Sequence, residues 1–232
     1  MTPRTPLDSL AAATKALLHE HDITDVVERL TADAMRFAAC DAAVLLARAG
    51  GRLELVGATS HAAPDLDLYQ ALTVEGPCRD AVATGGAVEA SGAGLIVERW
   101  PVVGPLLVDA GFRTVHAHPL AWHGGVIGAL TMFRQGTEPL DETQARTSRA
   151  FADMLALTVA QPDRLLVQDV DRRVARARSG RAVIEQAQGV LAHQLGIGVD
   201  AAYDELAARS VRTGAPLTVT ARDVVREARR PR

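Results

Sequence analysis

The N-terminal part of the chain carries two helical hydrophobic patterns followed by two strand-like ones. Apolar residues recur at intervals of three and four over residues 7–19 and 23–37, and Asp22 is suited to cap the second of these predicted helices. The apolar segments 43–48 and 52–58 are separated by a pair of glycines, which predicts a β-hairpin. The chain therefore begins with helices and continues into a sheet.

The elements that follow, up to residue 160, are short and are separated by glycine and proline. The pattern predicts helices at 65–72, 77–84 and 141–160 and strands at 88–90, 114–121 and 126–134. Helices, paired strands and a closing helix together give an α+β domain with an antiparallel sheet. Proline is tolerated at the start of a helix and not within one, so Pro162 is the predicted boundary between domains at residues 1–161 and 162–232.

A heptad pattern begins soon after this boundary. Its positions, alternately three and four residues apart, are Val167, Val170, Val174, Ala177, Arg181, Ile184, Gln188, Leu191 and Leu195. The pattern predicts a coiled coil and hence a homodimer, in which polar side chains at one heptad position fix the register. The dimer contacts are expected from Val167, Val170, Val174, Ala177, Ile184 and Leu191. Ser179-Gly180 is a point within the run where the helix could bend.

Two shorter helices are predicted after the heptad run ends at Gly196. Asp200 is a suitable N-cap for the first, which Gly214 should end. Thr220 and Asp223 resemble a capping box for the second. The C-terminal unit is therefore expected to contain three helices, of which the first is long.

Charge is distributed unevenly between the two predicted domains. The net charge of −3 combines about −7 before residue 163 with about +4 after it, where 13 arginines and no lysine face 9 acidic residues. This asymmetry points to an anionic partner such as nucleic acid, although a solvated helical surface would have the same composition. No segment has the roughly 18 apolar residues of a membrane span, and the N-terminus lacks the apolar core of a signal peptide. A cytoplasmic protein is expected.

The C-terminal residues resemble the ANTAR family, which are small three-helix RNA-binding output domains of bacterial antitermination regulators. The match is carried by RAVIEQAQGVL at residues 181–191, by Asp200–Tyr203 with Leu206, and by Leu217 and Ala221. This resemblance implies that the partner is RNA that forms paired hairpins. The chain departs from the family pattern at Gln188, where lysine is common, at Ala207, where a basic residue is frequent, and at Thr220, where valine is usual.

The N-terminal residues, about 8–160, resemble a GAF domain. The match is carried by EGPCRDAV at residues 75–82, by Arg99-Trp100-Pro101, by residues 110–117 and by residues 126–130. The resemblance implies a sheet with helices on one face and a cavity for a small molecule on the other. It implies sensing and does not identify the effector.

The candidate RNA-contacting residues are Arg181, Gln188, His193, Arg209, Arg212 and Arg222. Arginine contacts phosphates and stacks on unpaired bases, and glutamine hydrogen-bonds base edges. The alternative is seam packing for Arg181 and Gln188 and a solvated surface for the others. Tyr203 is expected in the core because of its helical spacing, so no aromatic platform for bases is expected.

Other chemistry has weaker support in the sequence. Cys78 near a helix start could be a redox-sensitive thiol, although a small buried cysteine is the simpler interpretation. His116, His118 and His123 could bind metal or haem, but no cysteine or carboxylate completes a ligand set. No catalytic motif was found, so a regulator without a cofactor is expected rather than an enzyme. The alternatives are a protein-interaction module that has lost RNA binding and a thiol reductase of the GAF type.

Overall fold

A computed structural model describes residues 5–19, 22–59, 68, 71–161 and 167–229. Side chains are described throughout these ranges except at 167–174, 176 and 177. The chain divides into two compact units, Met1–Gln161 and Pro162–Arg232. Each unit is described separately below.

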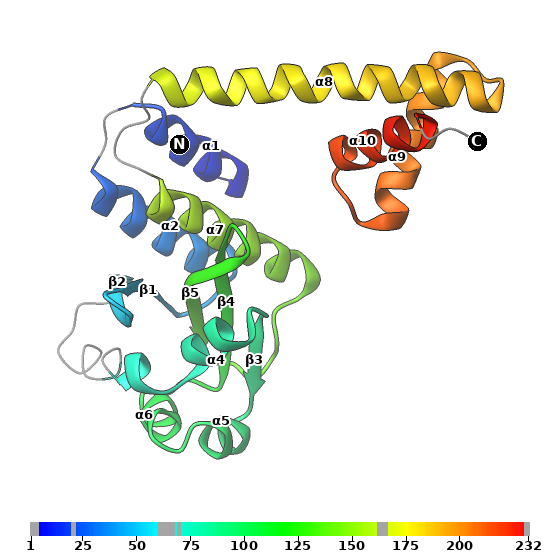
Figure 1. The fold of residues 1–232 in the computed structure, drawn as a ribbon. Coiled ribbons are helices and arrows are strands. Elements are labelled where there is room, and N and C mark those ends of the chain that lie inside the picture. The colour runs from blue at the N-terminus through cyan, green and yellow to red at the C-terminus, as the bar shows by residue number, and fades with distance from the viewer. Residues whose placement is uncertain (1–4, 20–21, 60–67, 69–70, 162–166, 230–232) are drawn as a thin grey trace. The chain divides into compact units, whose positions relative to one another are not determined.

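The first unit is built on a five-stranded antiparallel sheet with the strand order β2-β1-β5-β4-β3 (Figure 1). The strands are β1 (Ala42–Ala49), β2 (Arg52–Ala58), β3 (Val88–Ser91), β4 (Thr114–Trp122) and β5 (Gly125–Arg134). The predicted β1–β2 hairpin is confirmed, the predicted strands β4 and β5 form a second hairpin, and β5 pairs with β1 to place both hairpins in one sheet. The predicted α+β class of this unit is confirmed.

Helices cover both faces of this sheet (Figure 1). The first face packs against α2 (Ile23–Phe37) and α7 (Glu142–Ala160), and α1 (Pro6–Leu17) packs on these two helices. The second face packs against α4 (Pro77–Thr84), α5 (Ala93–Arg99) and α6 (Val103–Asp109). This second face was expected to carry the cavity, but its centre is filled by large apolar side chains, among which Trp100, Phe133 and Leu72 are almost completely buried.

Local sequence explains where these elements begin and how closely they pack. Asp22 caps α2 as predicted, and Asp141 forms a capping box with Gln144 at the start of α7. Gly128 on β5 pairs with Ala47 on β1, and a Cβ atom at Gly128 would lie 2.2 Å from the carbonyl oxygen of Leu46. Only glycine permits this approach of the two strands.

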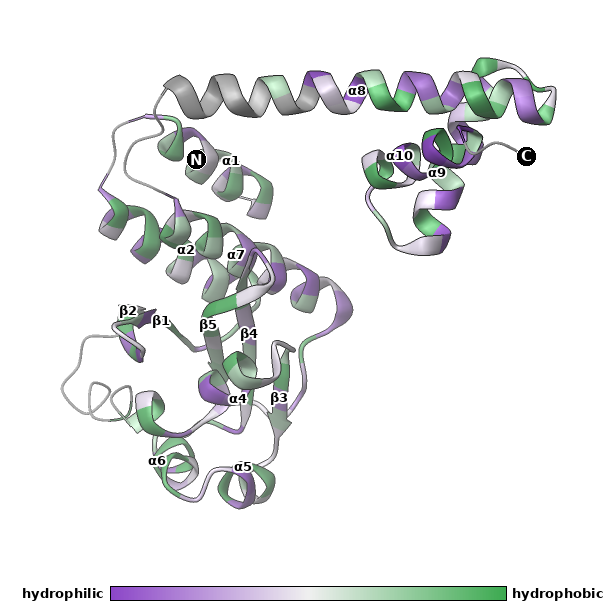
Figure 2. Cartoon of the chain, viewed as in Figure 1, coloured by the Kyte–Doolittle hydropathy of each residue, from purple (hydrophilic) through white to green (hydrophobic). Residues whose placement is uncertain are grey.

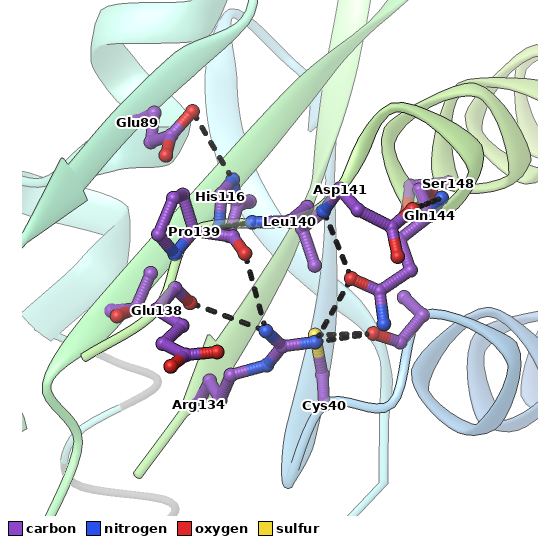
Figure 3. Close-up of polar contacts among 12 residues, drawn as sticks. Cys40, Glu89, His116, Arg134, Glu138, Pro139, Leu140, Asp141, Gln144 and Ser148 are labelled. Carbon is purple, nitrogen blue, oxygen red and sulfur yellow. Dashed lines mark hydrogen bonds and ion pairs between the residues drawn. The ribbon is translucent and has the colours of Figure 1, made fainter. Parts of the chain in front are cut away.

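A hydrogen-bonded cluster fixes the segment between β5 and α7 (Figure 3). The Arg134 guanidinium donates to the carbonyl oxygens of Ala38 and Ala39 after α2, and to those of Glu138 and Pro139 before α7. It also donates to the side-chain oxygen of Gln144 at 3.3 Å. One side chain therefore joins the end of α2 to the start of α7.

His116 on β4 extends this cluster toward the edge strand β3 (Figure 3). Its Nε2 atom accepts a hydrogen bond from the backbone N–H of Leu140 at 3.3 Å, and its Nδ1 atom lies 3.7 Å from the Glu89 carboxylate. Burial, and to a lesser extent the neighbouring His118 and Arg134, lowers the pKa of His116 to about 4. His116 is therefore neutral at neutral pH, which its acceptor role at Nε2 requires.

The second unit contains α8 (Val167–Leu195), α9 (Val199–Thr213) and α10 (Leu217–Ala228). Its core consists of fully or almost fully buried residues from all three helices, namely Ala187, Leu191, Ala202, Leu206, Ala221 and Val224. Figure 2 shows hydrophobic and hydrophilic residues alternating along the described part of α8, as expected for a helix with one packed face. The predicted all-α unit is confirmed.

Two predicted helix starts in this unit are wrong. The N-cap of α9 is Gly198, which places Asp200 in the first turn of the helix rather than before it. The N-cap of α10 is Pro216, and the Thr220 hydroxyl donates to the Pro216 carbonyl oxygen from within the helix. Acidic and hydroxyl side chains favour first turns as well as caps, so the sequence pattern did not separate the two positions.

The α8 helix is continuous across Ser179-Gly180, the point where the sequence allows a bend. Gly180 is instead a close-packing position, because a Cβ atom there would lie 3.1 Å from the Thr218 side chain of α10. Leu191 is completely buried against α9 and α10, so its predicted role in a dimer seam is corrected to a role within one chain. Ile184 is partly buried against the same core.

The remaining seam residues, Val167, Val170, Val174 and Ala177, have side chains outside the described residues. Their predicted dimer contacts stay a prediction, as does the homodimer.

Candidate nucleic-acid interface

The six predicted RNA-contacting residues lie on different surfaces of the second unit. Arg181 and Gln188 line one groove, Arg209 and Arg212 line a second, and Arg222 lines a third. His193 is exposed in the last turn of α8 and lines none of these three. The structure therefore does not bring the six residues together into one patch.

The first groove, which we call the Tyr203 groove, lies where α8, α9 and α10 meet and has a volume of about 410 Å³. Residues one turn apart on α8 form one wall, and α9 and α10 contribute one residue each. Its lining residues are Gly180, Arg181, Ile184, Glu185, Gln188, Tyr203 and Thr218. The groove combines an aromatic ring, an amide and a guanidinium, which is the chemistry that binds an unpaired base.

The exposure of Tyr203 overturns the prediction that it belongs to the core. Its side chain is 42% exposed, whereas Ala202 and Leu206 are completely buried. The two buried residues are four positions apart and define the packed stripe of α9, and Tyr203 lies about 100° further around the helix. The one aromatic residue of this unit is therefore available for stacking, contrary to the expectation from sequence.

Charge in the Tyr203 groove is partly compensated. The Arg181 guanidinium donates to the Glu185 carboxylate at 2.8 Å, and the two side chains are 83% and 56% exposed. Exposed ion pairs of this kind contribute little to stability, because water and salt screen them. Arg181 can therefore leave Glu185 for a phosphate at little cost.

The second groove is lined by as many carboxylates as arginines, and both of its arginines are paired with a further carboxylate, Glu205. Arg209 and Arg212 both donate to the Glu205 carboxylate, at 2.8 and 3.3 Å. The hydrogen bond from Arg209, with a smaller contribution from Arg212, lowers the pKa of Glu205, so the carboxylate stays ionised. Asp223 and Glu227 line this groove beside the two arginines. It is a poor site for phosphate, and Arg209 and Arg212 are better explained as partners of Glu205.

The third groove lies between α8 and α10 and is basic. Arg222 and Arg226 of α10 and Arg229, its C-cap residue, line it together with Val183, Gln186 and Val225. Arg226 pairs with Asp223, whereas Arg222 and Arg229 form no ion pair with any described residue. We call these three arginines the α10 basic face. Arg226 and Arg229 are not among the RNA-contacting residues predicted from the sequence, although their spacing from Arg222 places all three on one side of a helix.

The first unit offers no reactive thiol in its described residues. Cys78 is fully buried with its Sγ atom 2.7 Å from the Thr131 hydroxyl, and burial raises the pKa of its thiol to about 12. Burial likewise raises the pKa of Cys40 to about 11. Cys78 belongs to the core on one face of the sheet and Cys40 to the core on the other. Both thiols are protonated at neutral pH, and the sheet separates them.

The three histidines singled out in the sequence, His116, His118 and His123, also lack a metal-binding arrangement. His116 and His118 are buried on β4, and His123 lies in the turn that follows, against the Trp122 ring. Within the described ranges, no group of three or more His, Cys, Asp or Glu side chains could hold a metal ion. Nor does any helix in those ranges have the length and apolar character to cross a membrane.

Comparison with known families agrees with the division of the chain into two compact units. The GAF domain model matches residues 22–159, and the ANTAR domain model matches residues 172–225. The chain therefore belongs to the GAF domain family. It is a GAF-ANTAR protein, in which a sensor domain of one family precedes an RNA-binding output domain of the other.

Solved structures resemble the first unit in fold alone. The GAF domain of a phosphoenolpyruvate-protein phosphotransferase from Coxiella burnetii is 15% identical with a TM-score of 0.53, over 69% of this chain and 95% of that one. The corresponding domain from Acinetobacter is 11% identical with a TM-score of 0.51, over 66% and 92%. The fRMsr protein of Staphylococcus aureus in its reduced form is 14% identical with a TM-score of 0.50, over 68% and 97%. No curated protein matched this chain.

Proposed function

We propose that this protein is a transcription antitermination regulator that binds paired hairpins in nascent RNA. In this proposal the GAF domain senses a small molecule or a partner in the cytoplasm and controls the ANTAR domain, which acts as a homodimer. The observation that carries the proposal is the Tyr203 groove, an exposed aromatic ring beside Gln188 and Arg181 within a matched ANTAR domain.

The Tyr203 groove suits an unpaired base of a hairpin loop. A base stacked on an aromatic ring contributes about 1–3 kcal/mol. Gln188 is partly buried in the same groove, so its amide is held near the ring and can hydrogen-bond a base edge. Gln188 takes this role without the positive charge of a lysine, so phosphate contacts beyond that of Arg181 must come from another surface.

The α10 basic face supplies such contacts. Arg222 and Arg229 are exposed and form no ion pair with a described residue, so a phosphate meets no competing carboxylate there. Phosphate contacts with arginine release counterions and make binding depend on salt. Base recognition and phosphate binding are thus assigned to two surfaces of one three-helix unit.

A gel-shift titration of the full-length protein with a twin-hairpin RNA tests this assignment. Tyr203→Leu removes the stacking ring and should weaken binding at least about fivefold. Val211→Ala, on the same helix, changes a side chain that is 82% exposed and lines none of the three grooves, and should bind as the wild type does. Equal affinity of the wild type and Tyr203→Leu would remove the groove from the proposal. Read-through of a terminator in a transcription assay then tests antitermination.

A second function is favoured by the compensated charges. Arg181, Arg209 and Arg212 all pair with carboxylates, which leaves fewer free cations than an RNA-binding surface commonly presents. The second candidate is therefore a sensor whose C-terminal unit binds a protein. Absence of RNA binding at low salt, with a stable protein partner recovered by pull-down, would favour it.

A further inference from the structure

A cavity of about 510 Å³ opens at the edge of the first unit, between the β1–β2 hairpin and α4. We call it the hairpin cavity. It is lined by Arg48, Gly51, Arg52, Leu53, Thr73, Val74, Arg79, Val82 and Ala83. This volume lies within the range of about 300–1,000 Å³ that small-molecule sites occupy.

The composition of the hairpin cavity differs from that of the neighbouring core. The centre of the same sheet face is filled by apolar side chains, and it lies beneath α4, α5 and α6. At the edge, Leu53, Val82 and Ala83 form an apolar wall, and three arginines stand around it. Arg48 and Arg52 flank the turn of the hairpin, and Arg79 comes from the first turns of α4.

The nearby carboxylates are engaged elsewhere. Glu75 accepts hydrogen bonds from the backbone N–H groups of Val102 and Val103 at the start of α6, at 2.7 and 3.1 Å. Asp80 pairs with Arg99 at 3.1 Å and accepts a hydrogen bond from the Trp100 indole. The acidic residues closest in sequence to Val74 and Arg79 are thus turned away from the cavity.

The three arginines are therefore not neutralised within the described part of the chain, where none of them forms an ion pair. Arg79 is oriented by donating to the carbonyl oxygen of Thr73 at 3.3 Å, which leaves most of its guanidinium donors unused. Three like charges around one concave surface repel one another, and a bound anion relieves that repulsion. Guanidinium groups also match the geometry of phosphate and carboxylate.

We propose that the hairpin cavity binds a small anion that carries phosphate or carboxylate groups on a compact apolar body. The anionic groups contact Arg48, Arg52 and Arg79, and the apolar body packs on Leu53 and Val82. The role of this ligand as effector of an RNA-binding output rests on the proposed function. Its binding does not.

Thermal unfolding and calorimetric titration of the full-length protein test the site, with pyrophosphate and citrate as probes for the two anion classes. Arg48→Gln with Arg52→Gln removes two of the three charges. The matched control, Arg146→Gln with Arg149→Gln, removes the same charge from side chains of α7 that are 71% and 64% exposed. Unfolding without probe establishes that each variant is folded. Anions bound by the C-terminal arginines contribute equally to all three proteins.

At least one probe should bind the wild type and the control, and raise their unfolding midpoints. The Arg48→Gln/Arg52→Gln variant should bind it at least about tenfold more weakly, since two charge-assisted contacts to the anion are lost. Binding of neither probe to the wild type, or equal binding by this variant, would overturn the proposal. RNA gel shifts on the same preparations test the proposed function separately from the anion site. If the wild-type protein does not bind RNA, the proposed function is refuted, whereas the proposal of an anion site is unaffected.

Discussion

Replacing Leu191 by alanine distinguishes a core residue of one chain from a seam residue between two chains. The Leu191 side chain is completely buried among Ala187, Ala202 and Leu206. Truncating a buried leucine to alanine costs about 2–5 kcal/mol, which combines lost transfer free energy with the cavity left behind. A unit of this size rarely has more than about 3–5 kcal/mol of stability from its core. Leu191→Ala should therefore leave the C-terminal unit close to half unfolded.

Leu195→Ala is the matched control for this experiment. Leu195 occupies the next heptad position, and its side chain is 48% exposed. If the seam residues pack between chains, both substitutions should lower stability by similar amounts, and the unfolding midpoint should rise with protein concentration. If Leu191 packs within one chain, only Leu191→Ala should lower the free energy of unfolding substantially.

Chemical denaturation followed by circular dichroism, at two protein concentrations about tenfold apart, measures both quantities. The expected result for Leu191→Ala is a loss of about 3 kcal/mol that does not change with concentration. A loss below about 1 kcal/mol, or equal losses for the two variants, would refute the assignment of Leu191 to the core of one chain.

Three further predictions concern other contacts. Arg134→Met should destabilise the first unit by about 2–4 kcal/mol in chemical denaturation, because it leaves carbonyl groups after α2 and before α7 without their donor. The folded-state pKa of His116, about 4, lies below the unfolded value of 6.5, so the unfolded state binds more protons between these two pH values. The denaturant midpoint of unfolding should therefore fall between pH 7 and pH 4.5, and it should fall less in His116→Gln. Gly189→Ala, which adds a Cβ with no neighbour within 4 Å, should raise the melting temperature of the C-terminal unit, whereas Gly180→Val should lower it by crowding Thr218.

Much of the first unit could be predicted from its sequence because its signals are local. The period-two segments, the Asp22 and Asp141 caps and the Pro77 helix start each depend on a few adjacent residues. The filled second face of the sheet could not be predicted in this way. It depends on Trp100 and Leu72, which come from segments separated by some thirty residues and meet only in the folded domain.

The candidate site was harder to predict because function there depends on which side of a helix a residue occupies. The spacing that suggested a core position for Tyr203 holds for its neighbours Ala202 and Leu206, and a shift of one residue moves the ring to the surface. The sequence suggests that Arg209 and Arg212 are free cations, whereas in the structure both pair with the Glu205 carboxylate. The sequence shows these charges but not which of them are already paired.

The burial of Leu191 also changes what the heptad pattern can mean. Spacings of three and four describe a stripe that packs on any neighbouring helix, in the same chain or in another. On α8, Leu191 and in part Ile184, both in this stripe, pack against α9 and α10 of the same chain. A seam between chains is then left with the heptad positions from Val167 to Ala177, about one and a half heptads, whereas a stable coiled coil needs three or four. A dimer held by this segment alone would be weak, and a weak dimer is one that a sensor domain can shift with a small free-energy change.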